Sequence, residues 1–274
     1  AIPRDESSKA AFEAIVKKAV ETISNGSINK VVLSRKEVIE LPEFELVSVF
    51  TKLVQTYPTA FCYCWYHPKI GMWMGATPEH LLNAKKKSFY TMALAGTQKY
   101  VDTVDVNWGR KEMEEQQFVT DFIIDNLKDI TTEVSVSSPY TLQAGSLLHI
   151  KTDIEGILDQ DSNLEQVVAV LHPTPAVCGF PKAVAKHFIL ENENYHREYY
   201  TGFLGELNKK SSGNGKLQSD LYVNLRCMKI ENNNTSEITK ASLYMGCGIT
   251  KDSVPEDEWK ESENKSITMK KIVL

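Results

Sequence analysis

Hydrophobic residues recur at intervals of three and four positions in several stretches of the chain. This spacing gathers apolar side chains on one face of an α-helix and so predicts amphipathic helices. Asn25-Gly26 ends the first of them, since both residues tolerate the backbone conformation that terminates a helix. The predicted helices cover residues 8–23, 44–57, 109–127, 163–171, 181–192 and 257–271.

Shorter runs rich in β-branched and aromatic residues, bounded by turn residues, predict strands between these helices. They cover residues 30–35, 61–66, 71–76, 88–94, 199–207, 221–230 and 241–249, with β-rich sequence from 133 to 158. The connections 211–215 and 232–234 are rich in Ser, Gly and Asn and predict hairpins. Because no internal repeat or low-complexity linker divides the chain, we expect one α/β (α+β) domain over residues 1–274 with mainly antiparallel pairing.

A lysine begins the strand predicted over residues 30–35. Val31, Val32 and Leu33 predict that this strand is buried, and alternation places Lys30, Val32 and Ser34 on one of its faces. Two interpretations are open. Lys30 either marks the start of the strand and extends its ammonium to water, or it is retained inside for a chemical purpose.

Composition and charge exclude several classes of function. The chain has 274 residues, 42% of them hydrophobic, and a formal net charge of −5, which disfavours a nucleic-acid partner because phosphate binding needs a basic stripe. Its five cysteines are odd in number and none has CxxC spacing, so neither a zinc site nor a disulfide framework is indicated. A reducing cytoplasm fits this cysteine usage best.

No apolar stretch approaches the roughly 18 residues of a membrane span, and the first residues show no export signal. We therefore expect no membrane partner. The chain begins at Ala1 without an initiator methionine, which indicates a processed or trimmed start.

Two predicted helices carry glutamates on their apolar faces. In the helix over 109–127, the stripe that contains Phe122 continues back to Glu115 and to Glu112. In the last helix, Glu258 and Glu261 continue an apolar stripe in the same way. Acidic residues also favour helix starts through the macrodipole, so the pattern alone is not specific. Inward carboxylates from two helices nevertheless predict an oxygen site for one hard divalent cation, with Mg²⁺ the natural candidate.

Other stretches suit the close approach of an anionic ligand. Residues 95–97 and 246–248 contain glycines that could bring backbone N–H groups near an anion, although a turn or a bulge explains them equally well. Arg226, placed inside the predicted strand 221–230, needs a partner, either a ligand carboxylate or a structural acid. The proline-rich segment 171–181 predicts a rigid pocket wall, and Glu79 begins a turn after a strand.

Taken together, the motifs resemble those of chorismate-utilising enzymes, in order and over nearly the whole chain. This family includes isochorismate, salicylate, anthranilate and aminodeoxychorismate synthases. The resemblance implies a single α/β domain with a central antiparallel two-sheet β-sandwich flanked by helices, chorismate as the substrate, and a requirement for Mg²⁺. The matching segments are 30–35, 77–79, 94–97, 111–119, 148–149, 171–181, 225–227, 246–249 and 258–265.

The resemblance also assigns a role to each candidate residue. Lys30 is the general base and Glu79 the general acid for addition of water at C2 with loss of the C4 hydroxyl. Arg226 takes the enolpyruvyl carboxylate. Mg²⁺ is held through Glu115 and Glu261, with Glu112 and Glu258 as outer or water-mediated ligands. The remaining substrate-binding positions are Gly96, Thr97, His149, Ala176, Tyr200, Gly246 and Lys265.

Two positions distinguish members of the family. Ammonia-using members typically have glutamine where this chain has Lys30, so water is the expected nucleophile and no obligatory glutaminase subunit is expected. Ala176 is similar to the isochorismate-forming members, whereas salicylate and anthranilate synthases tend to have threonine. Salicylate formation and a non-catalytic chorismate-binding module stay open as alternatives. Gln116, where relatives often have histidine, is expected to turn away from the apolar stripe.

Overall fold

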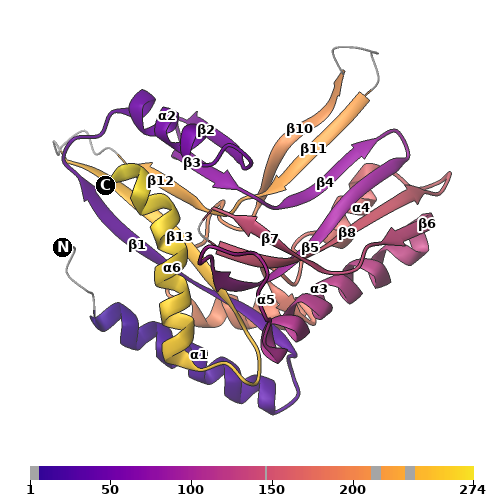
Figure 1. The fold of residues 1–274 in the computed structure, drawn as a ribbon, viewed down its shortest axis with the longest axis horizontal. Helices are drawn as coiled ribbons and strands as arrows, with labels where there is room; N and C mark the ends of the chain where they lie inside the picture. Colours follow the sequence, from indigo (N-terminus) through magenta and orange to yellow (C-terminus); the bar gives the residue numbers. More distant parts are fainter. Residues whose placement is uncertain (1–5, 146, 211–216, 232–237) are drawn as a thin grey trace.

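Two antiparallel β-sheets form the centre of the computed structural model, which describes residues 6–145, 147–210, 217–231 and 238–274 (Figure 1). The first sheet has the strand order β2-β3-β12-β13-β1-β9. Its strands are β1 (Lys30–Leu41), β2 (Phe61–His67), β3 (Gly71–Thr77), β9 (Gly179–Phe180), β12 (Cys227–Glu231) and β13 (Thr239–Ile249). Its longest pairing joins β1 and β13 from Val31 opposite Ile249 to Leu41 opposite Thr239.

The second sheet has the order β10-β11-β4-β5-β8-β6, and β7 also pairs with β8. Its strands are β4 (His80–Lys85), β5 (Ser88–Lys99), β6 (Thr131–Val136), β7 (Tyr140–Ala144), β8 (Leu147–Leu158), β10 (Phe203–Lys210) and β11 (Leu217–Val223). The register of β5 against β8 shifts between Ala95 and Gln98, where Gly96 has φ +73°. This bulge turns the end of β5, which glycine permits because it lacks a Cβ.

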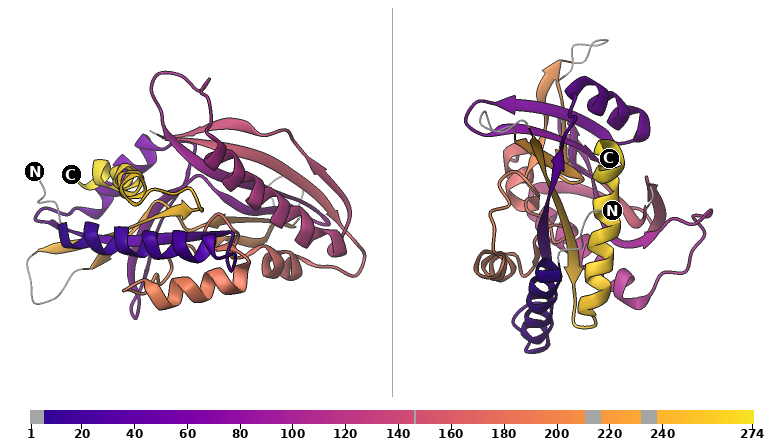
Figure 2. Two further views of the ribbon diagram at one scale, coloured as in Figure 1. Left: turned by 90° about the horizontal axis from the view of Figure 1, so that it is seen from below. Right: turned by 90° about the vertical axis from the view of Figure 1, so that its left-hand side faces the viewer.

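Helices pack against both sheets. They are α1 (Glu6–Ser24), α2 (Leu46–Thr56), α3 (Arg110–Leu127), α4 (Leu164–Leu171), α5 (Lys182–Asn192) and α6 (Pro255–Val273), with a 3₁₀ turn at Lys128–Ile130. Helices α1 and α5 lie side by side under the first sheet, where Phe12 and Phe188 share one apolar core with Val31 (Figure 2). Helices α3 and α4 close the core of the second sheet, in which Ile123 packs near Ile154.

The periodicity predictions are confirmed for every helix and for most strands. The prediction of one strand over 221–230 is wrong, because the chain leaves β11 after Val223 and enters β12 at Cys227, with Arg226 between them at φ +48°. Strand β4 was not predicted, so Glu79 precedes a strand, and β10 begins at Phe203, later than expected. The predicted hairpin turns 211–215 and 232–234 lie outside the described residues.

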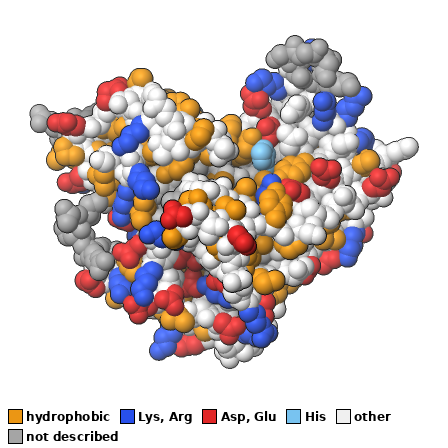
Figure 3. Space-filling model, in the orientation of Figure 1, with side chains coloured by type: hydrophobic (Ala, Val, Ile, Leu, Met, Phe, Trp, Pro, Cys, Tyr) orange, Lys and Arg blue, Asp and Glu red, His pale blue; other side chains and the backbone are white. Residues whose placement is uncertain are grey.

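The two central sheets and their flanking helices confirm the predicted fold class. Among the described residues, none of the helices is long and apolar enough to cross a membrane. Acidic and basic side chains are interspersed over the face of the molecule in Figure 3, and the coloured side chains there form no continuous basic stripe.

Candidate active site

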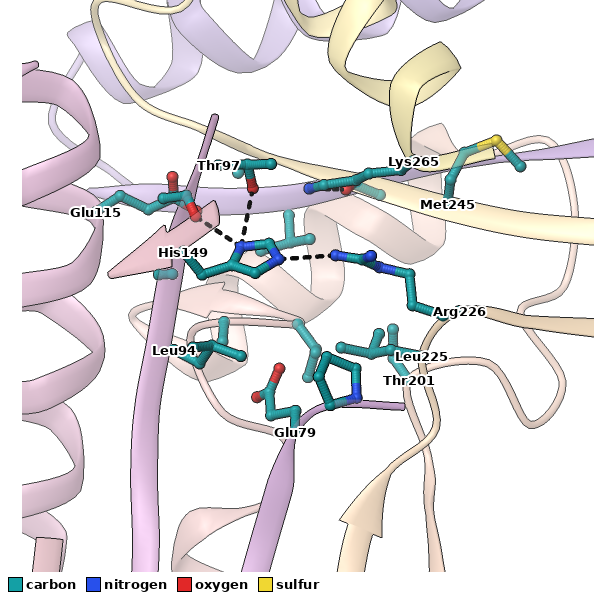
Figure 4. Close-up of a pocket in the computed structure, with 18 of the residues that line it drawn as sticks. Glu79, Leu94, Thr97, Glu115, His149, Thr201, Leu225, Arg226, Met245 and Lys265 are labelled. Carbon is teal, nitrogen blue, oxygen red and sulfur yellow. Dashed lines mark hydrogen bonds between the residues drawn. The ribbon is translucent and has the colours of Figure 1, made fainter. Parts of the chain in front are cut away.

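A pocket with an empty volume of about 670 Å³, its open mouth included, lies between the two sheets (Figure 4). The first sheet contributes residues of β1 and β13 to its wall, the second contributes β5 and β8, and α3 and α6 contribute Glu115 and Lys265. The structure brings every residue predicted to bind substrate to this pocket: Gly96, Thr97, His149, Ala176, Tyr200, Arg226, Gly246 and Lys265. Glu79 lines it as well, whereas Lys30, Glu112, Glu258 and Glu261 do not.

Lys30 does not line the pocket itself but contacts Glu115, which does. It is completely buried, so the interpretation that its ammonium reaches water is wrong. Its Nζ forms an ion pair with Glu115 Oε1 at 3.0 Å. Burial lowers the pKa of Lys30, and the attraction of Glu115 opposes that effect without overcoming it. Burial therefore shifts the protonation equilibrium of Lys30 toward the neutral amine, which is the form that can accept a proton.

Burial by itself would raise the pKa of Glu115, because desolvation favours the protonated acid. The ammonium groups of Lys30, Lys111 and Lys265 outweigh desolvation and lower the pKa of Glu115. The prediction that Glu115 points inward from α3 is therefore confirmed, and the pocket has an ionised carboxylate in its wall.

Glycines in β13 make room for two of these side chains. A Cβ at Gly248 would stand 2.1 Å from Glu115 Oε1 and 3.1 Å from Lys30 Cε, and one at Gly246 would stand 2.8 Å from Tyr200 Oη. Both glycines lie in regular strand opposite β1, so they are neither a turn nor a bulge. Alternation along β13 brings Gly246, Gly248 and also Tyr244 to the pocket. Tyr244 was missed by the sequence analysis, although this alternation could have found it.

Glu79 follows the end of β3 and is 4% exposed. Its backbone is held by the amide of Val223, which donates to the Glu79 carbonyl at 2.9 Å, and its carboxyl group points into the pocket (Figure 4). Burial raises the pKa of Glu79 to about 7, against the opposing charges of Lys30, Arg226 and Lys265. A carboxyl group with such a pKa can donate a proton near neutral pH.

Arg226 enters the pocket from the turn between β11 and β12, and its guanidinium donates to His149 Nε2 at 2.9 Å (Figure 4). On its other side, His149 Nδ1 lies 2.8 Å from the Gly96 carbonyl oxygen, so the ring donates there and accepts from Arg226. Burial and the nearby guanidinium lower the pKa of His149 to about 3, which keeps the ring neutral. The ring that accepts the hydrogen bond of Arg226 is therefore neutral.

Asn224 supports this turn and was missed by the sequence analysis. Its side chain accepts from the Tyr63 hydroxyl and donates to the Tyr199 carbonyl oxygen at 2.7 Å. Its backbone bonds both Thr201 and Gly202. These contacts tie the turn that carries Arg226 to the segment that carries Tyr200, and no periodicity in the sequence indicates such a connection.

A second partly buried arginine, Arg197, stabilises the proline-rich pocket wall. Its guanidinium donates to the carbonyl oxygens of Val32 at 2.6 Å and Val177 at 2.9 Å, both of which belong to residues of the pocket. Glu193 balances its charge. The prediction that residues 171–181 form a pocket wall is confirmed, because Ala176 and Val177 line it, but the arginine that anchors this wall was not predicted.

The predicted metal ligands divide into two groups: Glu258 and Glu261 lie close together, and Glu115 and Glu112 lie outside their cluster. Carboxylate oxygens of Glu258 and Glu261 and the sulfur of Cys247 lie within 4.8 Å of one another, and Lys111 pairs with Glu258. Glu115 is not in this cluster and faces Lys30 instead. Glu112 is not in it either, because its carboxylate folds back toward Gly109.

The donor set of the first group suits a hard cation. Glu258 is almost fully buried and its Oε2 has no hydrogen-bond partner among the described residues, while burial and Glu261 raise its pKa to about 7. Because Lys111 pairs with Oε1, only Oε2 of this buried carboxylate is left for a proton or a cation. The carboxylate oxygens of Glu258 and Glu261 are ligands of the kind that Mg²⁺ prefers, whereas Glu115, which was predicted to join them, lies outside this cluster.

The expectation for Gln116 is wrong. This residue is 4% exposed, and its side-chain amide donates to the hydroxyls of Thr120 at 2.8 Å and Thr152 at 2.7 Å. It therefore bonds α3 to β8 directly behind Glu115. The buried stripe of α3 is wide enough to include Gln116 next to Glu115. No pattern in the sequence indicated that Thr152 on β8 would be the partner of this helix position.

Comparison with known proteins decides the family. The profile described as chorismate binding enzyme matches residues 1–274. The chain belongs to the chorismate binding enzyme family. Isochorismate synthase EntC of Escherichia coli (strain K12) is 29% identical over 273 residues, which cover 95% of this chain and 66% of EntC. Isochorismate synthase MenF of the same strain is 29% identical over 279 residues, which cover 97% of this chain and 60% of MenF.

Solved structures agree with this assignment to the chorismate binding enzymes. The menaquinone-specific isochorismate synthase MenF from Escherichia coli superposes with a TM-score of 0.81 at 26% identity, covering 97% of this chain and 61% of MenF. Anthranilate synthase component I from Streptococcus pneumoniae TIGR4 superposes with a TM-score of 0.79 at 25% identity, covering 95% and 57%. The chain thus spans 60 to 66% of the length of the two curated relatives described above.

Proposed function

We propose that this chain converts chorismate to isochorismate in a Mg²⁺-dependent reaction, by adding water at C2 with loss of the C4 hydroxyl. The observation that carries the proposal is Lys30, a buried lysine whose pKa is lowered at the position where ammonia-using relatives are expected to have glutamine. The names of the relatives, isochorismate synthases EntC and MenF, support the same reaction. Chorismate is the small-molecule partner, and no glutaminase subunit is needed when water is the nucleophile.

The directions of the pKa shifts at Lys30 and Glu79 support their roles as base and acid. Water must lose a proton as it attacks C2, and the C4 oxygen must gain one as it leaves, so the net change is an isomerisation. Lys30 accepts the first proton as a neutral amine, and Glu79 supplies the second from a carboxyl group with a pKa of about 7. Because the Glu115 carboxylate stands between Lys30 and the pocket, we expect it to move aside when substrate binds.

The anionic ends of chorismate meet different parts of the site. Arg226, held by neutral His149, receives the enolpyruvyl carboxylate, and Tyr200 and Ala176 lie along the same pocket. Mg²⁺, held by Glu115 and Glu261 with Glu258 and Glu112 in its outer shell, would neutralise the ring carboxylate and withdraw electron density from the ring. Lys265, bonded to Glu261 and to the Gly246 carbonyl oxygen at 2.7 Å each, orients this end of the site.

Product analysis tests the proposal. The purified chain is incubated with chorismate and Mg²⁺ in a reducing buffer that imitates the cytoplasm, and products are separated by chromatography without an added lyase. Isochorismate that disappears when EDTA removes the metal is the expected result. Substantial salicylate fluorescence would instead identify a salicylate synthase, and unchanged chorismate despite measurable binding would identify a non-catalytic binding module.

A further inference from the structure

A second cavity, with an empty volume of about 620 Å³ including its mouth, adjoins the candidate active site. The two share Arg226 and Pro78, so these side chains form the partition between them. We call this second space the hairpin cavity, because the β7–β8 hairpin forms one of its walls. Residues that line it include Tyr57, Ala60, Pro78, Ala144, Arg226 and Thr268.

Specific contacts build the frame of the hairpin cavity. The Tyr57 hydroxyl donates to the Thr268 carbonyl oxygen at 2.9 Å, which joins the end of α2 to α6. At the hairpin, Gly145 has φ +64°, and a Cβ there would stand 2.9 Å from Tyr57 Cε1. Only glycine therefore lets the hairpin lie against the tyrosine ring without strain. A cavity framed in this way is a preformed space of the size that small ligands occupy.

The hairpin cavity has one charged residue among those that line it, which is Arg226. Two acids act on this guanidinium: Glu79, whose pKa burial raises to about 7, and Glu261, which pairs with Lys265. The side-chain partner of Arg226 is the neutral ring of His149. A guanidinium has five N–H donors, and His149 uses one of them, so donors are left for a ligand on each side of the partition.

The rest of the hairpin cavity is mainly apolar. Ala60, Ala76, Ala144, Leu142 and Pro78 offer small or aliphatic surfaces around the single charge. A ligand that matches this lining combines one carboxylate with a compact hydrophobic ring, because the carboxylate can bind Arg226 bidentately while the ring displaces water from the alanines.

We propose that the hairpin cavity is a binding site for small cyclic monocarboxylates of the benzoate class. A ligand in this cavity binds the side of Arg226 that is turned away from the active site. It weakens the binding of chorismate, because both carboxylates then compete for the positive charge of one guanidinium. By thermodynamic reciprocity, chorismate weakens the binding of the monocarboxylate by the same factor. Only this antagonism rests on the proposed function, which supplies the substrate carboxylate on the other side of Arg226.

The test measures binding, not turnover. Benzoate is titrated into the full chain and followed by ligand-observed NMR, with neutral benzamide as the isostere that lacks the charge. Two variants fill the hairpin cavity from different walls, Ala144→Leu and Ala60→Leu. Ala169→Leu, on an exposed position of α4, is the matched control. The dissociation constant of chorismate is measured on the same proteins through the fluorescence of Trp73, which stacks on Tyr244 of the pocket.

Benzamide should bind at least tenfold more weakly than benzoate. Both filled variants should lose at least tenfold in benzoate affinity and keep chorismate affinity within threefold, while the control matches the unmodified chain. Benzoate affinity that is unchanged in both filled variants would overturn the proposal. A parallel loss of chorismate affinity would also overturn it, because benzoate would then occupy the active site. Failure of the proposed reaction would show as absent isochorismate and would leave these binding results untouched.

Discussion

Replacing Glu79 by glutamine tests the proposed acid through two independent properties. Glutamine has nearly the same shape and cannot lose a proton, so the variant removes the titration while it retains the volume. The folded state holds the Glu79 pKa at about 7, against 4.5 for an ordinary glutamate, because burial penalises the charge. The folded chain therefore binds this proton more tightly than the unfolded chain does.

The sign of the effect on stability follows from that difference. A raised acid pKa stabilises the fold at low pH. Between pH 4.5 and about 7 the unfolded state has released the proton and the folded state still holds it, so this stabilisation is lost as the pH rises through that range. The rise of the pKa from 4.5 to about 7 corresponds to about 3 kcal/mol in full, most of which falls between pH 5 and pH 8. Between pH 5 and pH 8, the free energy of unfolding of Glu79→Gln should therefore rise by that amount relative to the unmodified chain.

Urea unfolding at pH 5 and pH 8, in EDTA, measures the difference in the free energy of unfolding between the two proteins. Exposed Glu133→Gln is the control and should show no such pH dependence. In the activity assay, Glu79→Gln should lower kcat by about 10² to 10⁴, the usual contribution of a positioned proton donor. A stability difference that stays constant between the two pH values, together with normal turnover, would refute both the raised pKa and the acid role.

Three further changes have distinct expected results. Lys30→Gln should reduce turnover about 10²- to 10⁴-fold while the dissociation constant of chorismate changes only a few-fold, and turnover near that of the unmodified chain would remove Lys30 from the base role. Gly248→Ala should displace Glu115 and weaken the effect of Mg²⁺ on activity, with circular dichroism as the check on folding. Mg²⁺ at 100 times its dissociation constant should stabilise the chain by about 2.7 kcal/mol in thermal unfolding, and Glu258→Gln should reduce that gain; an equal gain in both proteins would contradict the metal site.

Periodicity predicted much of this fold because it reports which face of each element is buried. The apolar stripe that predicted α3 also placed Glu115 inward, and alternation in β13 accounts for its glycines at the pocket. Periodicity failed where the chain breaks its pattern. Residues 221–230 have the composition of one strand, yet the chain turns at Arg226, since the bonds of Asn224 to segments distant in sequence stabilise the turn.

The sequence by itself determined most element types, the family and the predicted substrate-binding residues of the pocket, because local patterns and motifs are properties of consecutive residues. Only the tertiary structure decided the charge states on which the chemistry depends. Lys30 has an ordinary local sequence, and it is completely buried beside Glu115 because α3, which packs on the second sheet, brings that glutamate to the start of β1. The raised pKa of Glu79 and the neutral partner of Arg226 have the same origin, because desolvation and charge pairing depend on neighbours that are distant in the chain.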